Sequence, residues 1–137
     1  MVVSILALLA AQAVAPTPAE PSIEGRWRSP GGNSIIAIAP CGSTLCGTVD
    51  WASDRAKKDA RKATNQLVGT QLLTGLQQGV DGRWQGKLYI PDKNLRATAK
   101  LQVVGPQQLR VSGCLAGKSL CKTQMWTRAT DVPPSAN

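Results

Sequence analysis

The residues that could carry out catalysis are few. The chain of 137 residues contains no histidine, so a Ser-His-Asp triad, a Cys-His pair and a histidine-ligated metal are excluded. No glycine-rich phosphate loop, dinucleotide fingerprint or nucleophile elbow occurs, and no cofactor is expected. A carboxylate pair would come mainly from six aspartates in turns or beside Lys and Arg: Asp50, Asp54, Asp59, Asp81, Asp92 and Asp131. Since their spacing marks no glycosidase-type pair, we expect a protein that is not an enzyme.

Aromatic side chains are the best candidates for binding a ligand. The chain has four tryptophans, one tyrosine and no phenylalanine. Trp51 and Trp84 occupy positions that alternation predicts to face inward, and Leu88 and Ile90 follow Trp84 on the same face. These four residues are the candidate lining of a cavity for a small apolar or amphiphilic molecule. The alternative is a filled interior, because small barrels either pack their interior with side chains or hold one small ligand.

Positive charge is the second feature that points to a partner. The chain carries 16 Lys and Arg against 8 Asp and Glu, a formal net charge of +8. Residues 53–63 read SDRAKKDARKA and hold the basic residues Arg55, Lys57, Lys58, Arg61 and Lys62. Ser53 or Asp54 could cap a short helix there. Such a helix either contacts an anionic envelope surface or is simply solvated while it crosses one end of the fold. Nucleic acid is not an expected partner, because no aromatic residues interleave with the charges.

The amino terminus has the pattern of an export signal. Residues 1–14 read MVVSILALLAAQAV, an apolar run shorter than the ~20 residues of a membrane-spanning helix. Cleavage patterns of the A-x-A type follow at 11–13 and 13–15, although no Lys or Arg precedes the run. We expect residues 1–19 to be a signal peptide with a short linker, 20–130 to form one domain, and 131–137 to be a disordered tail. The prediction is a periplasmic or secreted protein with no integral membrane segment after signal removal.

Four cysteines form two close pairs in the sequence, which agrees with export. Cys41 and Cys46 enclose four residues, and Cys114 and Cys121 enclose six. An even number of cysteines in an exported chain indicates disulfides. We favour bridges 41–46 and 114–121 across the mouths of two hairpin loops, out of three possible connectivities. A zinc site made of all four thiolates is the alternative, although the spacings are wider than in the usual pairs. No metal site is therefore predicted.

The elements that must position these residues are strands. Apolar and polar residues alternate with period two through most of the chain. The expected strands are 25–29, 33–39, 45–51, 69–76, 83–90, 95–104, 107–114 and 121–129. A meander of about eight antiparallel strands protects its edges best by closing on itself. The sequence predicts an all-β up-and-down barrel with one short helix, and a two-sheet sandwich is the alternative.

Two short motifs resemble the signature of lipocalin and wider calycin barrels. Gly25-Arg26-Trp27 opens the first expected strand, and Trp126-Thr127-Arg128 closes the last. In that signature a tryptophan closes one end of the barrel and a basic side chain from the final strand covers it. The resemblance implies structural roles for Gly25, Trp27 and Arg128. A guanidinium stacked on an indole adds ~0.5–2 kcal/mol.

Longer segments resemble an uncharacterised bacterial envelope family, domain of unknown function 2147 (DUF2147). They read GRWRSPGGNSIIAIAPCGSTLCGTVDW, DGRWQGKLYIPD and LRVSGCLAGKSLCKTQMWTR, and the resemblance covers residues 23–128. It implies a lipocalin-like barrel of the periplasm with no established activity. Relatives read closer to YDPxxGxxY where this chain has residues 89–97, without the acid before Pro91, the glycine or the second aromatic residue.

Two functions from different classes follow. The first is a carrier or sensor that binds a small apolar or amphiphilic molecule inside the barrel. The second is an envelope interaction module with a filled core. Its basic face would bind lipopolysaccharide, peptidoglycan or a partner protein, and this binding would be sensitive to salt.

Overall fold

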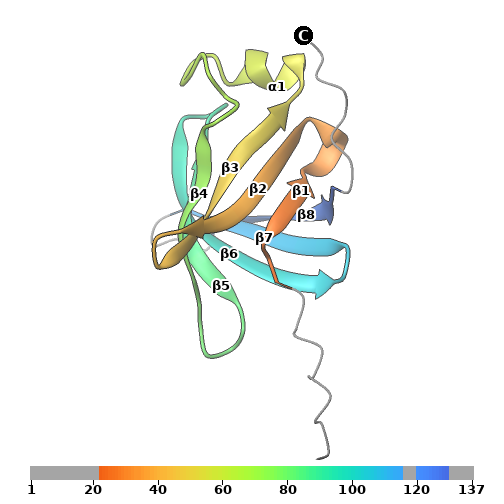
Figure 1. The fold of residues 1–137 in the computed structure, drawn as a ribbon. Coiled ribbons are helices and arrows are strands. Elements are labelled where there is room, and N and C mark those ends of the chain that lie inside the picture. The colour runs from red at the N-terminus through yellow and green to blue at the C-terminus, as the bar shows by residue number, and fades with distance from the viewer. Residues whose placement is uncertain (1–21, 116–119, 130–137) are drawn as a thin grey trace, which may run out of the picture.

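A computed structural model describes residues 22–115 and 120–129 (Figure 1). The expected signal peptide over residues 1–19 and the expected tail over 131–137 lie outside the described residues. The domain boundaries proposed from the sequence therefore stay predictions at both ends of the chain.

Eight antiparallel strands form a closed barrel in which every strand pairs with its neighbours in sequence, as Figure 1 shows. The strands are β1 (Gly25–Arg28), β2 (Ser34–Cys41), β3 (Thr44–Ala52), β4 (Gln71–Gln78), β5 (Trp84–Ile90), β6 (Leu95–Gly105), β7 (Gln108–Cys114) and β8 (Cys121–Arg128). A 3-10 turn η1 (Pro30–Gly32) follows β1, and one helix α1 (Asp54–Asp59) follows β3. The predicted up-and-down barrel is confirmed, and the sandwich alternative is wrong because β8 returns to pair with β1.

Both predicted disulfides are present. Cys41–Cys46 bridges the β2–β3 hairpin, and Cys114–Cys121 bridges the ends of β7 and β8. All four thiols are used in these two bridges. Each bridge closes a hairpin where the strand pairing stops, so it restrains the hairpin loop rather than the barrel wall.

The interior of the barrel is packed by leucines that fill the space left by inward glycines. A Cβ atom built on Gly47 would lie 2.9 Å from a methyl of Leu73. A Cβ on Gly86 would lie 2.9 Å from a methyl of Leu76. Because protein interiors are close-packed, these pairs leave no room for a ligand at the level of Leu73 and Leu76, both fully buried. At this level the interior is filled, which is the alternative that the sequence left open.

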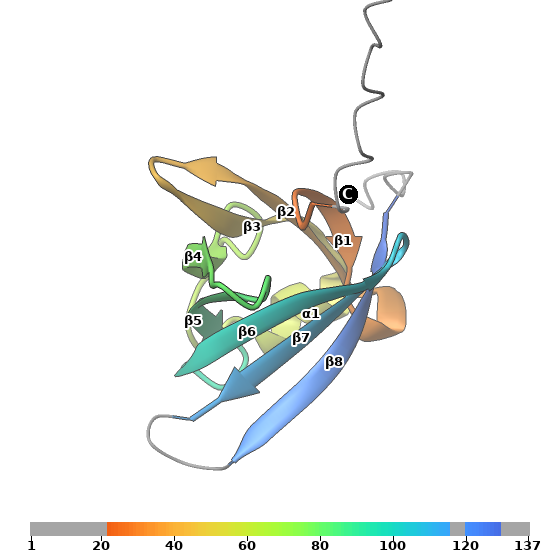
Figure 2. The same cartoon turned by 90° about the horizontal axis from the view of Figure 1, so that it is seen from below.

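Helix α1 lies across one end of the barrel, and Figure 2 shows it behind the strands at the far end. Ser53 is its N-cap, and the Ser53 hydroxyl accepts a hydrogen bond of 3.1 Å from the amide of Ala56. Ala56 and Ala60 pack on a second apolar cluster with Val49, Ala52 and Leu67. The helix is shorter than the segment 53–63 that the sequence singled out, because turns follow it after Asp59. One end of the barrel is thus covered by chain.

Candidate ligand site at the open end of the barrel

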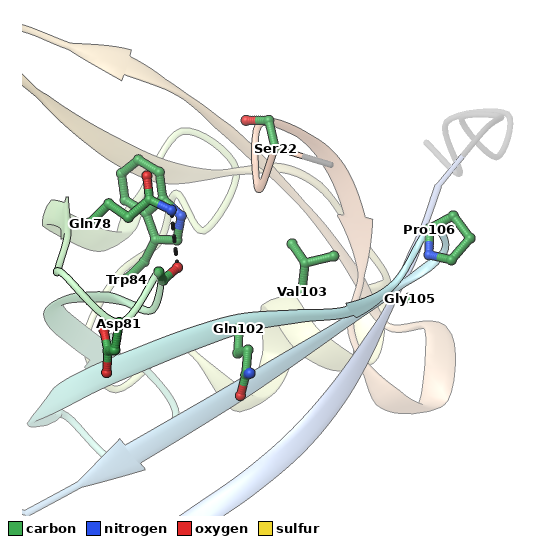
Figure 3. Close-up of a pocket in the computed structure, with 9 residues that line it drawn as sticks. Ser22, Gln78, Asp81, Trp84, Gln102, Val103, Gly105 and Pro106 are labelled. Atoms are coloured by element: carbon green, nitrogen blue, oxygen red, sulfur yellow. Dashed lines mark hydrogen bonds between the residues drawn. The ribbon is translucent and has the colours of Figure 1, made fainter. Parts of the chain in front are cut away.

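The end of the barrel opposite α1 holds a half-open pocket of about 670 Å³. Its lining comes from the residues before β1, from the β4–β5 hairpin and from the β6–β7 turn: Ser22, Gln78, Asp81, Gly82, Trp84, Gln102, Val103, Gly105 and Pro106. Figure 3 shows Trp84 and Gln78 on one side, Ser22 on another, and Val103 between them. The volume falls within the ~300–1,000 Å³ of typical small-molecule sites.

Trp84 is the principal apolar surface of this pocket. It begins β5, where it pairs with Gln78 on β4 and with Leu101 on β6. Its side chain is half-buried and packs against the main core cluster, as Val103 also does. An indole that is held by the core on one side and open to the pocket on the other offers a preformed apolar contact.

Polar groups border the same pocket. The Gln78 side-chain amide donates a hydrogen bond of 3.1 Å to the carbonyl of Gly82, which holds the β4–β5 turn in place, as the dashed line in Figure 3 marks. Ser22 supplies a hydroxyl, and Asp81 supplies a carboxylate at the rim. The arrangement suits a molecule with one apolar part and one part that forms hydrogen bonds. Among the described residues that line the pocket, Asp81 is the one acid, so they form no carboxylate pair.

The structure places Trp51 on the other face of the sheet. Ile35 pairs with Trp51 but Ile36 pairs with Val49, so Asp50 is an extra residue in β3, a β-bulge. Ile36 belongs to the main core cluster. Its neighbour Ile35 and the partner Trp51 therefore lie on the opposite face of the sheet, because adjacent residues of a strand point to opposite faces. Ile35 is fully buried there, but it belongs to neither core cluster. The inward orientation of Trp51 expected from alternation is wrong for this reason.

Leu88 and Ile90 lie further along β5 and do not meet Trp84 in the pocket. Leu88 packs over Gly113, where an added Cβ would lie 2.8 Å from a leucine methyl. Leu88 also borders a separate crevice of about 300 Å³ beside Lys87 and Tyr89. Ile90 pairs with Leu95 at the β5–β6 turn. It lies six positions along the strand from Trp84, which is about 20 Å at ~3.3 Å per residue.

The residues that resemble the lipocalin signature contact one another at the seam of the barrel, where β1 pairs with β8. The Arg128 guanidinium lies 4.0 Å from the centroid of the Trp27 ring. It also donates hydrogen bonds to the carbonyls of Ser22, Glu24 and Pro106 at 3.2, 3.0 and 3.3 Å. Trp27 is fully buried, and its indole N–H donates to the carbonyl of Ile23 at 2.8 Å. These contacts cross the seam where only Trp27 and Arg28 of β1 pair with β8.

Gly25 makes room for these contacts of Arg128. Its φ of +123° is one that other residues rarely adopt, and an added Cβ would lie 2.6 Å from Nη1 of Arg128. The glycine therefore provides both the backbone turn into β1 and the space for the guanidinium.

The basic residues of the helical segment lie in solvent. Arg55, Lys58, Arg61 and Lys62 are exposed, and Lys57 is half-buried. Asp54 and Asp59 are exposed in the same helix, so the charge of this surface is mixed. The segment covers one end of the barrel, as the solvated alternative expected, and contact with an anionic surface stays a prediction.

Ser22, Gln78, Val103 and Pro106 were missed as site residues by reasoning from the sequence. Gly79–Gly82 and Gly105-Pro106 have the composition of turns, but their proximity depends on both turns lying at the same end of the barrel. That follows from the strand order, since every second turn of a meander lies at the same end. The order of the turns along the chain could therefore have indicated which turns lie together, although no sequence motif marks these residues as a site.

Two further properties bear on the class of protein. Within residues 22–115 and 120–129, no three His, Cys, Asp or Glu side chains are grouped so that they could hold a metal ion. No helix in the same ranges has the length and apolar character that crossing a bilayer requires.

Comparison with known proteins gives one match. The family described as "Uncharacterized protein conserved in bacteria (DUF2147)" matches residues 25–128, from the first residue of β1 to the last of β8. Neither a curated protein nor a solved structure matches the chain. The match covers the whole barrel, so the chain belongs to the DUF2147 family.

Proposed function

We propose that this protein is an exported, non-catalytic barrel that binds a small amphiphilic molecule at its open end. The observation that carries the proposal is the half-open pocket of about 670 Å³ in which Trp84 and Val103 lie beside polar groups. A site of this composition gains affinity from the apolar contact and orientation from a few hydrogen bonds.

The proposed site is the mouth of the barrel and not its centre. The fully buried Leu73, Leu76 and Leu101 occupy the interior below the pocket. A ligand would therefore rest on this core with one side open to water. Such binding is weaker and more readily reversed than enclosure in a deep cavity, which suits a sensor or a transient carrier.

Export to the periplasm or beyond is part of the proposal. Two disulfides and the finding on membrane-crossing helices are compatible with a place outside the cytoplasm. The apolar run at residues 1–14 supports it as a signal peptide.

Native mass spectrometry of protein purified from the periplasm tests the binding proposal, and the neutral fluorescent amphiphile N-phenyl-1-naphthylamine serves as a defined probe. We expect saturable binding of the probe or a retained small molecule, with loss of either in Trp84→Ala. Trp51→Ala is the matched control, because it removes an indole that faces away from the pocket. Absence of saturable binding in the wild-type protein, or equal loss in both variants, would contradict a site at the mouth.

A second candidate function rests on the exposed cations of the helical segment. Arg55, Lys58, Arg61 and Lys62 project from the end opposite the pocket and could contact anionic lipopolysaccharide or peptidoglycan. This function predicts cosedimentation with envelope fractions that weakens as salt is added and is reduced in Lys58→Gln/Arg61→Gln. Binding that is indifferent to salt would count against it.

A further inference from the structure

The outer face of the sheet β4–β7 carries a groove that adjoins the proposed mouth site and is lined by cations that the mouth site lacks. A half-open depression of about 740 Å³ follows β4 to β6, and a smaller one of about 120 Å³ follows β6 and β7. Arg83 and Lys100 line both, so the two depressions adjoin and form one groove across neighbouring strands. Figure 2 shows β5, β6 and β7 side by side along this wall.

Four exposed cations line the groove: Arg83, Lys87, Lys100 and Arg110. Three of them follow a diagonal row. Lys87 pairs with Thr98, two residues from Lys100, and Lys100 pairs with Ser112, two residues from Arg110. Diagonal neighbours of this kind stand about 7–8 Å apart. The row therefore presents regularly spaced positive charge over three strands.

These charges have little compensation from acidic groups. Within residues 22–115 and 120–129, none of the four cations forms an ion pair, and the ion pair in that part of the chain joins Arg26 and Asp50. Asp81 is the carboxylate that lines the groove, and its oxygen accepts a hydrogen bond of 3.1 Å from the backbone amide of Arg83. An anion that entered the groove would meet cations free to pair with it.

Most of the remaining side chains in the lining are polar and uncharged, and Trp84 and Leu101 are its apolar members. Amides and hydroxyls of this kind come from Thr74, Gln77, Gln78, Gln85, Thr98, Gln102 and Ser112. None of the large apolar side chains exposed in the described chain lines the groove, although Val104 lies further along β6 and Met125 of β8 pairs with Arg110. A bilayer surface would favour apolar side chains that insert, and single-stranded nucleic acid would favour several aromatic rings. Amides and hydroxyls can donate hydrogen bonds to sugar hydroxyls and accept hydrogen bonds from them.

We propose that this groove binds a linear acidic polysaccharide. The carboxylates of the polymer pair with Lys87, Lys100 and Arg110, while its hydroxyls exchange hydrogen bonds with the neighbouring amides and hydroxyls. The groove adjoins the mouth pocket, because Gln78, Asp81, Trp84 and Gln102 border both, but its four cations do not line the mouth pocket.

Isothermal titration calorimetry with polygalacturonate tests the proposal, with neutral dextran, poly-L-glutamate and phosphatidylglycerol vesicles as comparisons. We expect polygalacturonate to bind most tightly and to lose affinity at high salt. Lys100→Gln/Arg110→Gln should weaken binding about fivefold, whereas Lys93→Gln/Lys122→Gln, two exposed lysines outside the groove, should change it less than about twofold.

Three results would overturn the proposal. Lack of binding to polygalacturonate would exclude acidic polysaccharides as the ligand class. Equal losses in the two double variants show attraction by net charge alone. Binding to poly-L-glutamate or to the vesicles that equals or exceeds binding to polygalacturonate shows that the sugar hydroxyls are not recognised. Thermal unfolding of each variant verifies that these exposed substitutions leave the barrel folded.

Discussion

Replacement of Gly86 by alanine tests whether the barrel core is filled. A Cβ atom at this position would lie 2.5 Å from the backbone oxygen of Thr74, 2.9 Å from a methyl of Leu76 and 3.1 Å from the carbonyl carbon of Gly75. Two of these three atoms belong to the backbone of β4, where a bulge between Thr74 and Gln77 brings the strand close to β5. The clash is relieved only if β4 moves away from β5.

The magnitude follows from two opposing effects. Overpacking of a core by one methyl group costs about 1–3 kcal/mol. Replacement of glycine by alanine also reduces the entropy of the unfolded chain, which returns about 0.4–1 kcal/mol. We expect the free energy of unfolding of Gly86→Ala to fall by about 1–2 kcal/mol. For a domain of this size that is a fall in Tm of roughly 5–15 °C.

Gly105→Ala is the matched control. An added Cβ there meets nothing within 4 Å, and its φ is not in the left-handed region. This variant should be as stable as the parent or more stable by about 0.4–1 kcal/mol. Urea unfolding with the disulfides oxidised, followed by tryptophan fluorescence, measures both variants. If Gly86→Ala kept the parental stability, the space beside Leu76 would be open, and a ligand cavity deep in the barrel would again be possible.

Three further substitutions probe the seam, a disulfide and the helix. Arg128→Met should reduce the free energy of unfolding, measured by chemical denaturation, by about 1–3 kcal/mol. The substitution removes the stacking on Trp27 and leaves three carbonyls without their hydrogen-bond donor. A change below experimental error would show that the pairing of β1 with β8 does not depend on Arg128. Replacement of Cys114 and Cys121 by serine should lower the free energy of unfolding by about 2.5 kcal/mol, which is the loop-closure entropy of a bridge with a sequence separation of 7. Calorimetry measures this loss, with the reduced parent protein as the comparison. Ser53→Ala should cost about 1 kcal/mol by loss of the N-cap hydrogen bond, with faster amide hydrogen exchange confined to α1, and Ser53→Asp should recover most of it.

Much of the fold could be predicted from the sequence because strand alternation and turn residues are local signals. The runs 83–90 and 95–104 match β5 and β6 to within one residue at each end. The cysteine pairs flank turn-rich segments, so bridges across hairpins followed without knowledge of the tertiary fold. The helix was recognised by its capping serine, although it ends at Asp59 and not at Ala63, because the pattern of charges alone does not mark a helix end.

The candidate site was only partly predictable, and Trp51 and Trp84 show why. Both tryptophans stood on inward-reading positions, yet only Trp84 borders the mouth pocket. The extra residue Asp50 shifts the register of β3 against β2, which turns Trp51 to the other face. No local feature of the sequence reveals such a bulge, because it is defined by the pairing of one strand with another.

By itself the sequence determined the all-β class and the resemblance to the family, and it favoured the two disulfides, because these rest on residue types and spacings along one stretch of chain. Only the tertiary structure decided whether the barrel is hollow. The glycines at 47 and 86 read equally well as the walls of a cavity, and leucines from β4 fill the space beside them. It also decided which cations share a face, since Lys87, Lys100 and Arg110 come from three strands whose register sets their spacing. Contacts between strands depend on pairing and bulges, and those form only when the whole barrel closes.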